Sequence, residues 1–344
     1  QYPSHSLSVA PNQYTTGANI SSWAFLTTRL LLVALTSSED DEKPGSTVYL
    51  PHLAVIDIPS ESHAPSKSPR PVPVSDANTV CAFHFPDLMD DIMVLNMDIL
   101  SGGGPSGPND WNPPFPGGPS STPFSPSSDP DHRLFLVKLH AVREYRNVMS
   151  MRVLVPASTF LRALSRSESE SEPESESESA PANSVPTRRD FVWAEWGEHG
   201  ARCFATVCDV SFASGGACAV HGTVFVTKRA DRVSPDGRVQ IVVTMRDFNQ
   251  LALRRRALAA DCEYEVGGED SESSTVPRGD EEEIACVRVV EEATVLEHAG
   301  WFKEEMTTSL PYTERVLVLL AERGHDGNWV MVMLTVDALM LTTY

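Results

Sequence analysis

The sequence predicts an all-β protein built from antiparallel sheets. Short runs rich in β-branched and aromatic residues recur along the chain, and turn residues separate them. No helical pattern of useful length is visible after Arg256. The remaining stretches are rich in Pro, Ser, Gly and Glu, and such stretches bury too little apolar surface to fold.

In chain order, the first apolar run covers residues 23–35, and its periodicity fits a strand and a short buried helix equally well. An acidic loop is expected at residues 37–46, followed by a strand at 47–58. Residues 79–100 are predicted to form two strands around Pro86-Asp87.

Residues 134–139 and 151–155 are also predicted strands, and residues 156–164 a short turn or helix. Residues 191–197 are expected to be extended, with Phe191 and Trp193 on one side. Further strands are predicted at residues 204–212, 217–227, 239–246, 284–295, 315–321 and 329–336.

The stretch at residues 238–256 is the most regular part of the chain. A strand alternates Val239, Ile241 and Val243 with their neighbours, and a turn follows at Asp247-Phe248-Asn249. The stretch ends in a basic run at residues 254–256, which we interpret as a solvated cap on the turn.

These elements predict a single domain at residues 23–344, preceded by a disordered segment at 1–22. Disordered inserts are expected at residues 59–78, 101–131, 165–187 and 263–283. Residues 102–107 fit G-x-G-x-x-G, but the prolines that follow exclude the helix that a dinucleotide site needs. No cofactor is expected.

Charge and cysteine content narrow the classes of function. The formal charge of −20 argues against nucleic-acid binding and against adhesion to an anionic membrane. The run at residues 23–35 is too short to span a membrane, and Arg29 interrupts it. The six cysteines are sparse, as expected of reduced core residues in an intracellular protein of the cytoplasm or nucleus.

Several segments resemble, in the same order, the region downstream of the F-box in fungal (basidiomycete) F-box and F-box-like proteins. They are CAFHFP at 81–86, RLFLV at 133–137, VLVPASTFL at 153–161, FVWAEWG at 191–197, HGTVF at 221–225, RDFNQLALRR at 246–255 and LPY at 310–312. The tryptophan segment followed by Asp-Phe-Asn is the most specific part, and none of the segments is a catalytic motif.

This resemblance implies a β-propeller-like region that presents a bound partner to a ubiquitin ligase. The F-box itself, which docks the Skp-type adaptor, is not found in residues 1–46, so that adaptor is expected as a partner only if an F-box lies upstream. The resemblance assigns no partner-binding residue.

The sequence offers only weak evidence for a metal site or a catalytic site. Cys203, Cys208, Cys218 and His221 have ligand types that suit zinc, but side chains on strands alternate faces, so buried thiols are the better interpretation. No Gly-x-Ser-x-Gly elbow is present, which argues against one class of hydrolase.

Two carboxylate pairs and two aromatic residues are further candidates for a catalytic or ligand-binding site. The pairs Asp90-Asp91 and Glu304-Glu305 consist of adjacent residues, which face opposite ways on a strand. Trp193 and Trp196 suit ligand stacking and core packing, and core packing is the commoner role. Arg246 with the basic run at 254–256 suits a small anion or partner site as well as a solvated cap.

The sequence therefore predicts a non-enzymatic interaction module for a protein partner of unknown identity, without catalytic, metal or cofactor residues. The alternatives are a hydrolase-type enzyme with an unrecognised site and an inactive, diverged member of the family.

Overall fold

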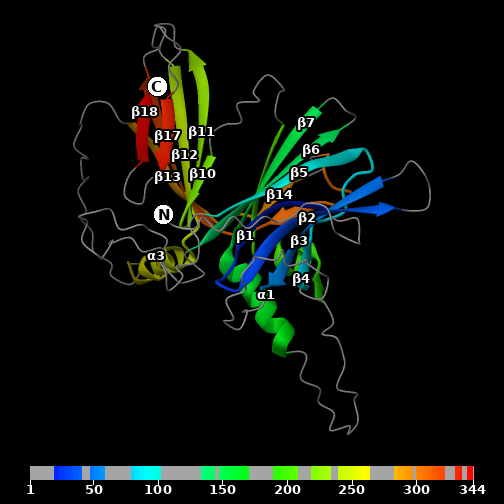
Figure 1. Ribbon diagram of the computed structural model, residues 1–344. Coiled ribbons are helices and arrows are strands. Elements are labelled where there is room, and N and C mark those ends of the chain that lie inside the picture. The colour runs from blue at the N-terminus through cyan, green and yellow to red at the C-terminus, as the bar shows by residue number, and fades with distance from the viewer. Residues whose placement is uncertain are drawn as a thin grey trace, which may run out of the picture.

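The computed structural model describes residues 19–40, 47–58, 79–101, 133–143, 147–169, 189–207, 218–233, 239–263, 283–296, 300–321, 330–334 and 339–343. These residues form mainly antiparallel sheets, which confirms the all-β class (Figure 1). Residues 1–18 and most of each predicted insert lie outside the described residues.

The first sheet has the strand order β1-β2-β3-β4-β8. Its strands are β1 (Asn19–Phe25), β2 (Leu30–Asp40), β3 (Thr47–Asp57), β4 (Thr79–His84) and β8 (Arg189–Phe191), and only the β4–β8 pair is parallel. The run at residues 23–35 is thus a hairpin, closed by a turn in which Leu30 N donates to Thr27 Oγ1 at 2.9 Å. The predictions of disorder at 19–22 and of a loop at 37–40 are wrong, because both segments continue this hairpin.

The second sheet has the order β5-β6-β7-β9. Its strands are β5 (Ile92–Ser101), β6 (Leu134–Arg143), β7 (Asn147–Pro156) and β9 (Arg202–Val207). The strands predicted in residues 79–100, 134–139 and 151–155 are confirmed. One face packs against the first sheet, and Phe83, Leu53, Phe135 and Met151 are fully buried in the shared core.

Two helices, α1 (Ala157–Ser169) and α2 (Trp193–Trp196), pack against this core. Trp193 and Trp196 are buried, and Trp196 Nε1 donates to the His84 carbonyl oxygen at 3.1 Å. The prediction of an extended segment is wrong at Trp193, where the chain makes one helical turn. Gly197 permits this turn, because a Cβ there would lie 2.3 Å from the Trp193 ring. α1 also runs to Ser169, beyond the predicted start of the acidic insert.

The third sheet has the order β10-β11-β12-β16-β13. Its strands are β10 (Cys218–His221), β11 (Val224–Val233), β12 (Val239–Asp247), β16 (Tyr312–Ala321) and β13 (Glu283–Val290). The single strand predicted at residues 217–227 is a hairpin, because Gly222 takes a φ of +55° and turns the chain.

Two short hairpins complete the described strands. They are formed by β14 (Thr294–Leu296) with β15 (Met306–Thr308) and by β17 (Val330–Leu334) with β18 (Leu339–Thr343). The strand predicted at residues 284–295 is therefore two strands that belong to different sheets.

A second apolar cluster, called the joint here, connects the second and third sheets. It consists of Leu134, Leu136, Leu154, Phe225, Phe248, Leu310 and Tyr312, all buried. Leu134 and Leu136 come from the face of β6 that points away from the main core, and Leu134 N donates to the Gly222 carbonyl oxygen at 3.0 Å. The described strands show neither a closed propeller ring nor a closed barrel.

Candidate partner-binding surface

The basic run predicted as a cap on a turn is part of a helix, α3 (Gln250–Glu263), which directly follows β12. The prediction that no helical pattern of useful length follows Arg256 is wrong at this point, because α3 continues to Glu263. The signal was present, because QLALRRRALAADCE is rich in strong helix formers and an asparagine precedes it. Figure 1 shows α3 below the strands of the third sheet.

The Asp-Phe-Asn-Gln part of the family-like sequence fixes the start of α3. The Asp247 carboxylate accepts from Asn249 N at 3.0 Å and from Thr223 Oγ1 at 2.7 Å. Asn249 is the N-cap residue, and its side-chain oxygen accepts from Ala252 N at 3.0 Å. These bonds satisfy backbone donors that a helix start leaves open.

Two further contacts hold this start against the joint. Gln250 Nε2 donates to the Pro311 carbonyl oxygen at 2.9 Å. Phe248 is buried against Tyr312, with ring centroids 5.2 Å apart, and its N–H donates to the Thr223 carbonyl oxygen at 3.0 Å. The segments at 221–225, 246–255 and 310–312 thus meet at one place, and together they set the position of α3.

The arginines of this region divide into two environments. Arg254, Arg255 and Arg256 are exposed on α3. Arg246 instead lies 4.5 Å over the Phe204 ring and donates from Nε to the buried Glu314 carboxylate at 2.9 Å. Arg288 donates to the same carboxylate at 2.8 and 3.0 Å. The alternative that groups Arg246 with the basic run in one site is not supported, since Arg246 belongs to an ion-pair network with Glu314 and Arg288.

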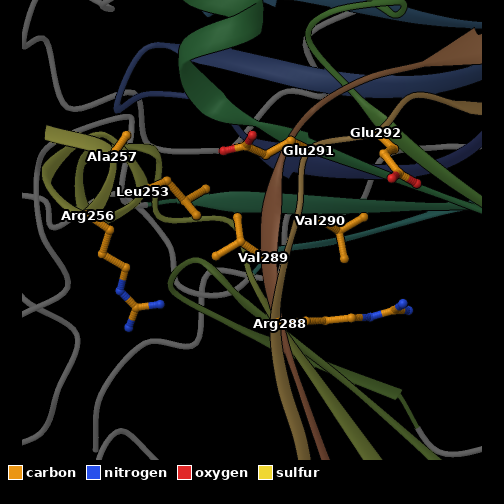
Figure 2. A pocket seen from close by; sticks show the side chains of 8 residues that line it. All are labelled: Leu253, Arg256, Ala257, Arg288, Val289, Val290, Glu291 and Glu292. Carbon is orange, nitrogen blue, oxygen red and sulfur yellow. The ribbon is translucent and has the colours of Figure 1, made fainter. Parts of the chain in front are cut away.

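A groove of about 480 Å³ lies between α3 and β13. Leu253, Arg256 and Ala257 line it from the helix, and residues 288–292 line it from the strand. Figure 2 shows Leu253 and Val289 reaching toward one another across the groove, while Arg288 points to the other side of the strand. The groove thus has an apolar floor, with Arg256 at one margin and Glu291 and Glu292 at the other.

β13 is an edge strand among the described residues, because it pairs with β16 on one side only. Val287 and Val289 are 55% and 45% exposed, which is unusual for β-branched residues of a sheet. Leu251 and Leu258 on α3 are exposed as well. Sequence reasoning missed this surface, since it depends on which strand pairs with which.

The zinc candidates do not come together in the described part of the chain. Cys203 is fully buried in the main core, whereas Cys218 packs against the joint. Burial raises the pKa of the Cys203 thiol, which opposes the thiolate that a metal ligand must be. Cys208 lies outside the described residues, and no group of three metal-ligating side chains is found among those that are described.

The two aspartates of the first carboxylate pair form ion pairs with different cations. Asp91 accepts from Arg143 Nε at 2.6 Å, and Asp90 from Lys303 Nζ at 2.8 Å. Glu304 and Glu305 are exposed on the loop before β15. The Gly-rich motif at residues 102–107 lies outside the described residues. These positions therefore offer no pair of carboxylates facing one another across a cleft.

Comparisons with known proteins found no matching family model, no matching curated protein and no matching solved structure. Within the described residues, no helix combines the length and the apolar character needed to cross a membrane.

Proposed function

We propose that this chain is the partner-binding part of an F-box-like adaptor of a ubiquitin ligase, and that it acts as an interaction module without catalytic activity inside the cell. The observation that carries the proposal is the convergence of family-like segments at the base of α3. Their hydrogen bonds position an exposed basic helix beside β13, which is an edge strand among the described residues.

The sheets support a scaffold role. A rigid β framework that presents variable surface elements is a common basis of recognition. A propeller-like arrangement is part of the proposal, because four-stranded antiparallel meanders are the unit of propeller blades. β1 to β4 form one such meander.

The test is affinity capture of the tagged full open reading frame from its native cells, with a tag-only control and mass spectrometry of the captured proteins. We expect a Skp-type adaptor and a cullin among them, with the adaptor docked through an F-box upstream of residue 1. Capture of a stable, abundant protein without either would contradict the ligase role. An inactive relative or an unrecognised enzyme would then be the remaining alternatives.

A further inference from the structure

Natural proteins use charged residues to keep open edges from pairing, and the part of β13 that follows Glu283 carries few of them. Residues 284–290 contain one charged residue, Arg288. Its guanidinium makes two hydrogen bonds to Glu314, and its side chain leaves the strand on the side opposite Val289 (Figure 2). On the groove side, Val289 is exposed instead. Such an edge suits the addition of a strand from another chain.

The first part of α3, which lies beside this edge, is basic in a protein whose formal charge is −20. Residues 250–258 of α3 contain three arginines and no acidic residue. Arg256 lines the groove, and Arg254 and Arg255 precede it on the same helix. Glu291 and Glu292 line the opposite margin, so the groove has a basic end and an acidic end.

We propose that the groove between α3 and β13 binds an extended acidic peptide of a partner protein, which adds a strand to β13. An apolar side chain of the peptide packs between Leu253 and Val289, and a carboxylate of the peptide pairs with Arg256, the α3 arginine that lines the groove. Electrostatic complementarity of this kind determines which partners bind and how fast they associate. This inference rests on the proposed function in that it names the class of partner the module recognises.

The experiment measures peptide binding to the purified full chain by fluorescence anisotropy. The probe is a labelled octapeptide of alternating valine and glutamate, and its counterpart carries lysine in place of glutamate. We expect the acidic peptide to bind at least tenfold more tightly than the basic one, with affinity that falls as salt is raised. Methylation of alternate backbone nitrogens should abolish binding, because it removes the donors that pair with the strand edge.

Two triple variants that remove the same number of positive charges distinguish the effect of the α3 arginines from the effect of the protein's net charge. The triple variant Arg254→Ala/Arg255→Ala/Arg256→Ala should weaken binding about tenfold, the scale of losing several partly exposed ion pairs together. The control Arg29→Ala/Arg162→Ala/Lys303→Ala removes the same charge at exposed positions outside the groove and should bind like the unmodified chain. Val289→Asp should also weaken binding, with the thermal unfolding midpoint measured to verify folding.

Equal affinity for the two peptides, or equal loss in both triple variants, would overturn the inference. So would a dimer, measured by sedimentation, that Val289→Asp dissociates, because a second copy would then occupy the edge. If acidic peptides bind but no cullin is captured from cells, the ligase role alone fails. If a cullin is captured but the peptides are not distinguished, this inference alone fails.

Discussion

At the scale of single residues, two buried charged groups, Arg133 and Glu314, are held by specific partners. Arg133 donates from Nη2 to the carbonyl oxygens of Phe25 and Leu26, and its guanidinium lies over the Phe135 ring. Burial lowers the pKa of Arg133 to about 10. Glu314 instead bridges two guanidiniums, those of Arg246 and Arg288, within the third sheet.

Substitution of Glu314 tests this bridge. Glu314→Gln leaves Arg246, whose side chain is 17% exposed, beside a second cation without a counter-charge. We expect a loss of about 2–3 kcal/mol in the free energy of unfolding, measured by urea denaturation, because removing one partner of a buried pair leaves an uncompensated charge. The double variant Glu314→Met/Arg246→Met should recover much of this loss. A single variant as stable as the unmodified chain would contradict the bridging role.

His140 gives a pH dependence whose direction follows from its surroundings. Burial lowers its pKa below 6.5. Asp98 opposes this effect, and Lys138 and Arg152 add smaller effects in the same direction as burial. Below about pH 6.5 the unfolded chain therefore takes up a proton that the folded chain resists. The contribution of His140 to stability is present above this pH and is lost as pH falls through the folded-state pKa.

The measurement is the urea midpoint of the unmodified chain and of His140→Gln at pH 8 and pH 5. We expect the urea midpoint of His140→Gln, relative to that of the unmodified chain, to be higher at pH 5 than at pH 8. A difference that does not change with pH would show that the imidazole does not titrate differently on folding.

At the scale of elements, α3 depends on the cap at Asn249 more than on its packing, because its described residues are largely exposed. Asn249→Ala should cost about 1 kcal/mol of stability and reduce the helical signal in far-UV circular dichroism. Asn249→Ser keeps a side-chain acceptor and should behave like the unmodified chain. Equal effects of the two substitutions would indicate that the cap does not hold the helix.

The strands were predictable from the sequence wherever β-branched and aromatic residues alternate, as in β6, β7 and β12. Helix α1 was predicted in part, as a short turn or helix at residues 156–164, whereas α2 and α3 were not predicted, for two physical reasons. α2 is a single turn set by Trp193 packing and Gly197, which no periodicity records. α3 was missed because the consecutive arginines were interpreted by their charge, although their helix propensity is high.

The candidate surface was less predictable than the strands. β13 becomes an edge only because it pairs with β16, and the exposure of Val287 and Val289 follows from that pairing. The family-like segments were visible in the sequence, but their common location at the base of α3 comes from long-range hydrogen bonds. Local patterns carry no information about such contacts.

At the scale of the whole molecule, the two apolar clusters differ in size. The main core unites the first and second sheets with α1 and α2, whereas the smaller joint is the apolar cluster that connects the third sheet to the second in the described part of the chain. We therefore expect the third sheet to open more readily than the other two, since local stability follows the amount of buried apolar surface.

Phe248→Ala tests this expectation, because Phe248 is 1% exposed within the joint. The substitution should remove about 3–5 kcal/mol of packing energy. Amide exchange measured by mass spectrometry should then accelerate in β10 to β13 and β16 while β6 and β7 stay protected. Phe160→Ala, in the main core, should accelerate exchange in all three sheets. A uniform response to both would mean that the molecule opens as one unit.

The central claim is that α3 and β13 together form the partner-binding surface. The most direct test is hydrogen–deuterium exchange of the full chain with and without a directly interacting protein identified by capture. We predict new protection in residues 250–258 and 287–292, lost in the triple arginine variant. Protection confined to the first sheet, with α3 and β13 unchanged, would contradict the claim and would place the partner on another face of the molecule.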